Sequence, residues 1–403
     1  MGPRGRDLED AGAQRRLRRA RERRARSIRR RRGGALGAAA AVAAILGAAL
    51  GAGAGEEPAP TPEARIPEQC AGSDRAAMRR LAGQRLMVRT DGIPDAPLLA
   101  RARRATIAGV IVFPAEGAER AEIRSGLERL QEAAAKAGPP LLVATDQEGG
   151  PVKRFAEAPP LRAPIELGEF GDAADARLEG RATGNFLRGT GINTDLAPVL
   201  DVPGQEDSVM SLRAFGSDAA TVSRLGLAFA AGLSSEGVLA AAKHFPGLGR
   251  SLLNTDFASS EISAARRDLR EDLRPFRAAV EASIPLIMVG LASYPQLGAP
   301  GPAALEPAIA TELLRARLGF EGVSISDDLQ AEAVSAATGG PAAARRAAAA
   351  GIDLLLFART PAPEIHAALV SALERGGLEL EAARESCVRV VGLREELAAT
   401  EQE

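Results

Sequence analysis

The stretch LLVATDQEGG, residues 141–150, is an apolar run that ends in a polar turn, and the chain repeats this arrangement elsewhere. VLAAAKHFPG at 238–247 and GVSISDDL at 322–329 have the same form. Short, continuous apolar runs are typical of parallel strands that are buried on both faces. In an eight-fold β/α barrel the functional residues stand at the carboxyl ends of such strands. The three stretches therefore predict the fold and also the end of the barrel that carries the site.

Eight such runs follow one another, separated by segments in which apolar residues recur at helical spacing. Eight β/α repeats in about 300 residues fit a closed (β/α)8 TIM-like barrel. An open doubly wound sheet is the alternative, but it would need two edge strands, and none of the runs has that character. No GxGxxG or P-loop pattern follows the first run, which excludes the usual nucleotide-binding motifs. The runs span residues 86–90, 107–113, 141–146, 192–202, 238–245, 286–291, 322–328 and 353–358.

The net charge of −1 over 403 residues conceals an uneven distribution. Residues 1–32 hold fourteen Arg and four acidic residues, a net charge of +10, so the remainder is strongly acidic. A uniformly basic nucleic-acid-binding protein would not have this distribution, and no nucleic-acid partner is expected. RNA binding by the Arg-rich block is the weaker alternative, since an apolar segment follows it directly.

Residues 33–55 contain no charged side chain. This length matches the roughly 20 residues of a membrane-spanning helix, and the preceding basic tail should stay cytoplasmic while the rest is exported. A retained single-pass anchor and a cleaved signal segment are both open, with the anchor favoured because the run exceeds a usual signal core. A soluble Ala-rich helix is disfavoured, because each Gly costs about 1 kcal/mol in a helix. We expect a Pro-rich linker at 56–72 and the barrel at 73–403.

Cys70 and Cys387 lie near the two ends of the expected barrel. A barrel brings its ends together, and an exported protein can keep a disulfide, so one interpretation is a Cys70–Cys387 bridge. Two unpaired buried thiols are the other. No Cys/His spacing is typical of a metal site, and no cofactor is expected.

Three motifs resemble the N-terminal, catalytic domain of glycoside hydrolase family 3: DQEGGPVKRF from Asp146, AAKHFPGLG from Ala241 and SISDDL from Ser324. Within that family the chain is most similar to single-domain bacterial β-N-acetylhexosaminidases. The resemblance implies a retaining mechanism, in which a carboxylate forms a covalent glycosyl-enzyme, and Asp327 matches that nucleophile. Adjacent side chains of a strand point in opposite directions, so we expect Asp328 to cap the next helix instead.

The resemblance also implies sugar-binding residues at the ends of other runs. Asp146 ends the third run, and its carboxylate can accept hydrogen bonds from the hydroxyl groups of a sugar. A satisfied core histidine is the alternative for His244. Asp201 matches another acidic residue of the family, for which we expect a supporting role more than direct contact. The implied sugar-binding residues are Asp146, Arg154, Arg213, Lys243 and His244.

The loop that carries the acid/base in these relatives differs here. Family hexosaminidases have approximately KHFPGHGDTxxDSH, and their last Asp–His pair transfers protons. This chain has KHFPGLGRSLLNTD at 243–256. Leu248, Asn254 and Asp256 therefore replace His, Asp and His, so the family dyad is absent.

Two interpretations of this loop are open. In the first, Asp256 is itself the general acid, since a carboxylic acid is the commoner choice among glycosidases. Its pKa would have to be raised, and nearby Leu252, Leu253 and Phe257 would do so by desolvation. In the second, the loop is inactive and the barrel only binds glycans.

The function hypothesis is a retaining glycoside hydrolase that removes β-linked N-acetylhexosamine from glycans, with cell-wall fragments as the natural substrate of an exported or membrane-anchored protein. A non-catalytic glycan-binding protein is one alternative. A hydrolase of another β-glycoside, such as a β-glucoside, is the other. The expected partners are the glycan and, through residues 33–55, the membrane, and the barrel is expected to be a monomer.

Overall fold

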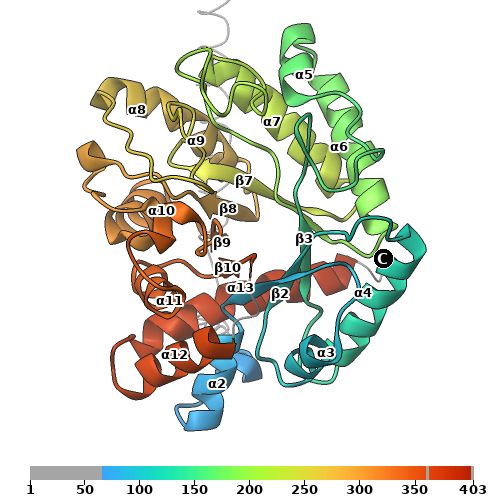
Figure 1. Cartoon of the computed structure of the whole chain (residues 1–403), viewed down its shortest axis with the longest axis vertical. Helices are drawn as coiled ribbons and strands as arrows, with labels where there is room; N and C mark the ends of the chain where they lie inside the picture. The colour runs from blue at the N-terminus through green and yellow to red at the C-terminus, as the bar shows by residue number, and fades with distance from the viewer. Residues whose placement is uncertain (1–65, 360–362, 401–403) are drawn as a thin grey trace, which may run out of the picture. The chain divides into compact units, whose positions relative to one another are not determined.

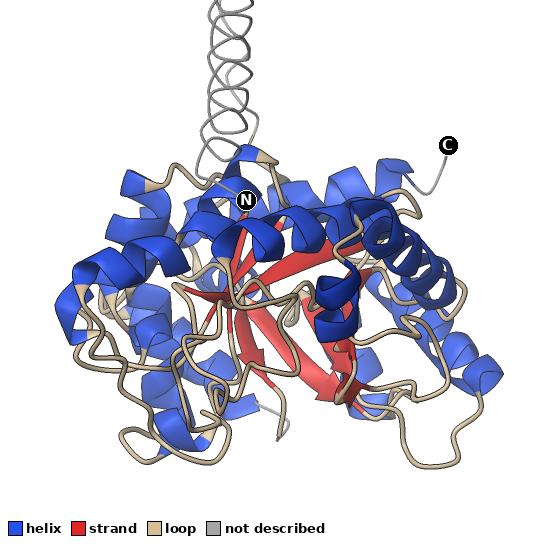
Figure 2. Ribbon diagram, turned by 90° about the horizontal axis from the view of Figure 1, so that it is seen from above, coloured by secondary structure: helices blue, strands red, loops and turns tan. Residues whose placement is uncertain are grey.

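Eight parallel strands form the centre of the computed structural model, which describes residues 66–359 and 363–400. Their order in the sheet is β10-β1-β2-β3-β6-β7-β8-β9. A parallel bridge between Ile325 and Leu354 joins the two outer strands, so the sheet closes on itself. Helices surround the strands in both views (Figures 1 and 2). The predicted barrel is confirmed, and the open doubly wound alternative is wrong.

The strands and helices alternate along the chain as the apolar runs predict. The barrel strands are β1 (Leu86–Thr90), β2 (Gly109–Val112), β3 (Leu142–Thr145), β6 (Thr194–Asp195), β7 (Leu239–Phe245), β8 (Leu286–Val289), β9 (Val323–Ser326) and β10 (Leu355–Phe357), and a hairpin of β4 (Gln147–Gly149) and β5 (Val152–Lys153) follows β3. The α-helices are α2 (Arg75–Gly83), α3 (Ala96–Arg103), α4 (Arg120–Ala134), α5 (Pro164–Phe170), α6 (Ala173–Arg188), α7 (Ala219–Ser234), α8 (Arg266–Asp272), α9 (Arg274–Glu281), α10 (Glu332–Ser335), α11 (Gly340–Ala349), α12 (Pro363–Glu374) and α13 (Leu380–Thr400). Short 3₁₀ segments are η1 (Glu68–Cys70), η2 (Pro295–Leu297) and η3 (Ala303–Leu305), and η4 (Ala308–Arg317) is a π-helix.

The fourth apolar run, 192–202, forms a much shorter strand than its length suggests. Only Thr194–Asp195 pairs regularly, and a single bridge from Val199 to Lys243 continues the contact with β7. Pro198 lies between them and has no backbone N–H to donate to a ladder. The regular ladder therefore ends early, although backbone hydrogen bonds to Ala241 and Lys243 of β7 continue as far as Leu200, just before Asp201.

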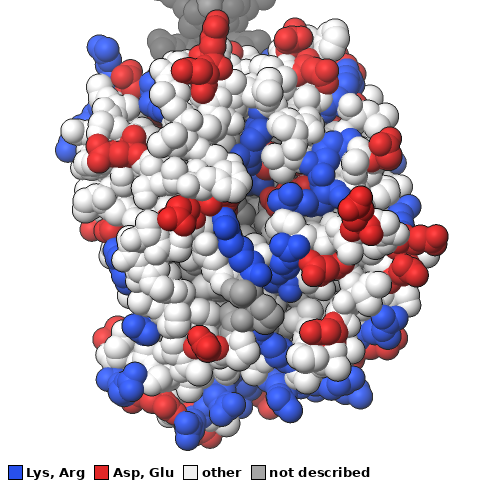
Figure 3. Space-filling view, viewed as in Figure 1, with Lys and Arg blue, Asp and Glu red and all other residues white. Residues whose placement is uncertain are grey.

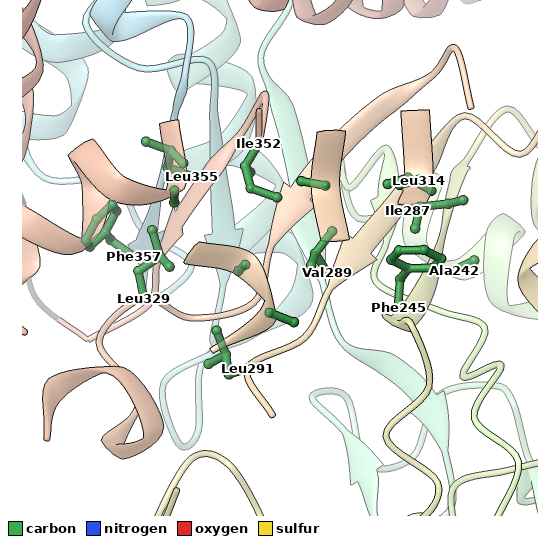
Figure 4. Close-up of a cluster of buried hydrophobic side chains, with 14 of the residues drawn as sticks. Ala242, Phe245, Ile287, Val289, Leu291, Leu314, Leu329, Ile352, Leu355 and Phe357 are labelled. Atoms are coloured by element: carbon green, nitrogen blue, oxygen red, sulfur yellow. The ribbon is translucent and has the colours of Figure 1, made fainter. Parts of the chain in front are cut away.

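The strands separate two apolar layers, because successive side chains of a strand face opposite ways. On β1, Met87 belongs to the cluster inside the barrel, whereas Leu86 and Val88 pack outward against the helices. Figure 4 shows a part of the outer layer. Val390, Leu393 and Leu397 of α13 join the inner cluster and so close one end of the barrel, which leaves the site at the other end.

Cys70 of η1 and Cys387 of α13 form a disulfide, and both side chains are buried. It ties the start of the barrel domain to the helix that closes the barrel. The basic tail and the segment 33–55 predicted above lie outside the described residues. None of the described helices is both long and apolar enough to cross a membrane.

Replacement of both cysteines by Ser should lower the stability of the barrel. The bridge closes a loop of 317 residues, and removing such a constraint on the unfolded chain typically costs about 2–5 kcal/mol. We expect the melting temperature to fall by roughly 4–15 °C. Thermal unfolding with and without reductant measures this, with the double variant as the control that reductant should not affect. An unchanged melting temperature would contradict the prediction.

Candidate active site

A cavity of about 470 Å³ opens at the carboxyl ends of the barrel strands. On the face in Figure 3, acidic and basic side chains border a central hollow. The fold brings together in the cavity wall all the catalytic and sugar-binding residues proposed from the sequence: Asp146, Arg154, Arg213, Lys243, His244, Asp256 and Asp327. Asp146 directly follows β3, Lys243 and His244 lie in β7, Asp327 follows β9, and the others lie in loops between these elements.

Lys243 is the centre of an ionic network in the floor of this cavity. Its Nζ lies 2.7 Å from Asp146 Oδ1 and 2.6 Å from Glu148 Oε1, and its side chain is only 2% exposed. Arg213 donates to both oxygens of Glu148, at 2.8 and 2.7 Å. Arg154 donates to the other oxygen of Asp146, at 2.9 Å. Two carboxylates and three cations thus form a fixed polar surface that can bind hydroxyl groups.

Sequence reasoning missed Glu148, although a signal for it was present. Asp146 and Glu148 are two residues apart in extended chain, a spacing that places two side chains on the same face. Burial alone would raise the pKa of Glu148, but the charges of Arg213 and Lys243 outweigh burial and lower it to about 2. For Asp146 the charges of Lys243 and Arg154 likewise overcome burial and hold the pKa well below its usual range. Both groups are therefore ionised at neutral pH.

His244 is oriented by Asp201. Its Nδ1 lies 2.7 Å from Asp201 Oδ2, and its Nε2 lies 3.4 Å from Arg213 Nη2. Asp201 also accepts a hydrogen bond from the backbone N–H of Leu248, at 2.6 Å. Asp201 itself is fully buried behind the cavity wall, so it acts on the site through His244 and the start of the following loop.

Asp327 lies directly after β9, where its N–H donates to the carbonyl of Val289 at 3.0 Å. Its Oδ1 accepts a hydrogen bond from the N–H of Asp328, at 2.8 Å. Burial raises the pKa of Asp327, the positive charge of His244 would lower it, and the charge of Asp256 raises it further. The two carboxylates are thus close enough to interact, and both line the cavity.

Asp328 does not cap the next helix, so that expectation is wrong. α10 has Ala331 at its N-cap, with no side-chain hydrogen bond. Asp328 Oδ1 instead accepts from the N–H groups of Gln330 and Ala358, at 3.0 and 3.1 Å, and its Oδ2 pairs with Arg359 at 3.1 Å. The carboxylate therefore fastens the turn after β9 to the turn after β10.

The loop that carries Asp256 lies against this turn. The carbonyl of Asp256 accepts from the N–H of Glu332, at 3.2 Å, and its own N–H donates to Asn254 Oδ1, at 2.9 Å. Leu252, Leu253 and Phe257 are 51%, 50% and 76% exposed. Phe257 nevertheless lines the same cavity as Asp256. Desolvation of Asp256 by these three side chains stays a prediction.

Glu148→Gln should destabilise the site strongly. The change removes the charge that holds Lys243 and Arg213, and breaking a buried ionic network typically costs about 3–5 kcal/mol. We expect a lower melting temperature and a weaker apparent affinity for sugars. Thermal unfolding and sugar titration measure the two effects. Glu157→Gln, at an exposed position in the loop after β5, is the matched control; equal melting temperatures for the two variants would contradict the role of Glu148.

No group of three or more His, Cys, Asp or Glu in the described part of the chain is arranged to hold a metal ion. The cavity wall contains carboxylates that are able to do acid–base and nucleophilic chemistry. One of them, Asp327, stands on a rigid strand end, and a second, Asp256, on a loop across from it. Such a pair suits acid–base and nucleophilic chemistry at a sugar ring.

Comparison with known proteins shows the family of the chain and the similarity of its fold. The family profile described as Glycosyl hydrolase family 3 N terminal domain matches residues 98–393. An uncharacterized secreted glycosyl hydrolase from Arthroderma benhamiae is 33% identical over 336 residues, which cover 79% of this chain and 93% of the relative. The structure of a β-N-acetylhexosaminidase from Beutenbergia cavernae is similar with a TM-score of 0.73 and 31% identity, over 79% of this chain and 98% of that one. The structure of a glycoside hydrolase family 3 β-N-acetylglucosaminidase from Paenibacillus is similar with a TM-score of 0.76 and 30% identity. The match covers 79% of this chain and 62% of that longer protein.

Proposed function

The chain belongs to glycosyl hydrolase family 3, and on that premise we propose that it is a retaining β-N-acetylhexosaminidase with Asp327 as nucleophile and Asp256 as general acid. The observation that carries the proposal is the presence of two carboxyl groups, those of Asp327 and Asp256, in one cavity. Both carboxyl groups line this cavity, and the charge of Asp256 helps to raise the pKa of Asp327. Both also stand beside a polar surface suited to a sugar ring.

In the proposed mechanism Asp327 attacks the anomeric carbon while Asp256 gives its proton to the departing glycosidic oxygen. Water then hydrolyses the glycosyl-enzyme, with Asp256 as the base that accepts its proton. The network of Lys243, Asp146 and Glu148 would hold the hydroxyl groups of the sugar. His244 lies near Asp327, and its charged form would stabilise the ionised nucleophile.

The substrate class and location are part of the same proposal. Relatives and structural neighbours named as β-N-acetylhexosaminidase or β-N-acetylglucosaminidase favour a β-linked N-acetylhexosamine. The Cys70–Cys387 disulfide and a relative described as secreted favour an exported protein, because disulfides persist in oxidising compartments. Glycans outside the cytoplasm, cell-wall fragments among them, are the substrates available there.

Incubation with aryl β-glycosides of N-acetylglucosamine and glucose tests the activity. Faster release from the N-acetylglucosamine substrate supports the proposal, and faster release from the glucoside would mean another β-glycosidase. No release from either, together with binding of N-acetylglucosamine in a titration, would overturn the proposal in favour of a glycan-binding protein.

Export can be tested on intact cells whose wall has been removed. The basic residues 1–32 followed by the uncharged segment 33–55 predict a cytoplasmic N-terminus and an exported barrel. Added protease should therefore digest the barrel unless it has already been released to the medium. A cytoplasmic protein of known location serves as the integrity control, and full protection of a barrel that stays with the soluble cell contents would contradict export.

A further inference from the structure

The side chain of Arg359 joins Asp328, the residue that follows the proposed nucleophile, to the backbone of Asp256. It follows β10 and is 46% exposed. Its Nε donates to Asp328 Oδ2 at 3.1 Å, and its Nη2 donates to the carbonyl oxygen of Asp256 at 3.0 Å. Its backbone N–H donates to Gln330 Oε1, at 3.0 Å. One guanidinium thus joins the neighbour of Asp327 to the backbone of Asp256.

We propose that Arg359 is a positioning residue that holds the Asp256 loop in register with the nucleophile. This inference rests on the proposed function and identifies what aligns its two carboxylates. Backbone bonds from Glu332 and Ala333 to the carbonyls of Asp256 and Thr255, at 3.2 and 3.1 Å, dock the same loop on α10. Arg359 adds a hydrogen bond that connects the same loop to the turn after the barrel strand β10. A planar guanidinium can reach both acceptors at once, whereas an ammonium is a single point donor.

The alignment matters because a proton donor must stay within hydrogen-bond distance of the glycosidic oxygen. The exposed side chains of Leu252, Leu253 and Phe257 give the loop little apolar burial. Its position therefore depends on a few polar bonds, and Arg359 supplies the one that comes from the turn after β10. A displacement of about 1 Å can cost on the order of 10²-fold in rate.

Arg359 also supplies charge. It pairs with Asp328, which is 10% exposed and directly follows Asp327. The other charged groups that act on Asp327 are His244 and Lys243 from β7 and Asp256 from the loop. Without Arg359, the charge of Asp328 would lose its cationic partner and disfavour the ionised form of Asp327. The acidic limb of the pH profile should then move to higher pH.

Arg359→Gln removes both the charge and the double contact. We expect kcat/KM to fall about 10²-fold with an N-acetylglucosamine disaccharide, but less than about fivefold with an activated aryl glycoside, which needs little protonation. Arg359→Lys should keep the acidic limb of the wild type while still losing activity on the disaccharide. Arg181→Ala, which breaks the ion pair between Arg181 on α6 and Glu236 after α7, is the control and should change neither the acidic limb nor the activity on the disaccharide.

A double variant separates positioning from a general structural effect. If Arg359 acts through Asp256, adding Arg359→Gln to Asp256→Ala should slow the disaccharide reaction no further than Asp256→Ala alone. The inference would be overturned if the rate losses of the two substitutions multiplied in the double variant. It would also be overturned if Arg359→Gln lowered kcat/KM equally on the disaccharide and on the aryl glycoside.

Amide hydrogen exchange provides a readout that does not depend on activity. In Arg359→Gln, exchange at residues 254–257 should rise at least about tenfold, while exchange in the barrel strands and the melting temperature stay near wild type. Unchanged exchange in the loop would overturn the inference. If the wild type is inert on every β-glycoside, the proposed function fails, and the exchange experiment still decides whether Arg359 holds the loop.

Discussion

Asp327→Asn should abolish turnover, with kcat falling at least about 10⁴-fold on every β-glycoside substrate. The amide has nearly the same shape as the carboxyl, but it cannot act as an anionic nucleophile. Its oxygen can still accept the hydrogen bond from the N–H of Asp328. Steady-state rates of the purified variant, measured with an activated aryl glycoside, check the prediction.

The same substitution should leave the fold as stable as the wild type or more stable. Burial raises the pKa of Asp327, and the charge of Asp256 raises it further. A raised pKa means that the folded state holds the proton more tightly, so stability falls as the pH rises from the unfolded value through the folded one. Asn carries no such charge, so the variant should melt at or above the wild-type temperature at neutral pH.

The outcome that would contradict the assignment is wild-type activity in Asp327→Asn. Asp207→Asn, at an exposed position outside the cavity, is the matched control and should keep full activity. The raised pKa also predicts that wild-type kcat/KM falls on the acidic side at a pH above that of an ordinary aspartate. Because Asp327 and Asp256 interact, this limb reports on the pair.

Asp256→Ala should slow substrates with poor leaving groups by about 10²–10⁴-fold, the usual contribution of a general acid. Activated aryl glycosides need little protonation, so their glycosylation step should change much less. Added azide should restore turnover, because it attacks the glycosyl-enzyme without a base. Rates across a series of leaving groups, with and without azide, measure the effect.

The position of the loop decides whether Asp256 can act as the general acid. Asp256 takes the position where relatives have His, and an aspartate side chain is shorter, so the loop must bring it close to the sugar. Equal rates for Asp256→Ala and the wild type on all substrates would show that Asp256 is not the acid. Formation of a β-glycosyl azide in the rescued reaction would independently support the covalent intermediate.

Much of the fold could be predicted from local pattern. Continuous apolar runs indicate buried parallel strands because the pattern depends only on which side chains avoid water. The same runs placed Asp146, Lys243 and Asp327 at strand ends, and parallel strands bring those ends to one face of a barrel. The run at 192–202 forms a shorter strand than its length suggests, since the regular pairing ends at Asp195, ahead of Pro198.

The contacts of the candidate site could not be predicted in this way. Glu148 meets Arg213 across 65 residues of sequence, and Arg359 meets the carbonyl of Asp256 across 103. Local pattern says nothing about such pairs, because they depend on the register of the barrel strands and on where each loop turns back. The prediction that Asp328 caps a helix was wrong for the same reason. Its partners Ala358 and Arg359 lie on the turn after β10 and not on the helix that follows Asp328.

The barrel and the end of it that carries the site could thus be predicted from the sequence, because hydrophobic periodicity and strand polarity are local properties, while the family resemblance supplied most of the residues expected in the cavity. The pairing of charges, the bond between Cys70 and Cys387, and the way the Asp256 loop lies against the turn after β9 became evident only from the folded structure. These depend on distances between segments far apart in the chain, which become fixed only when the barrel closes.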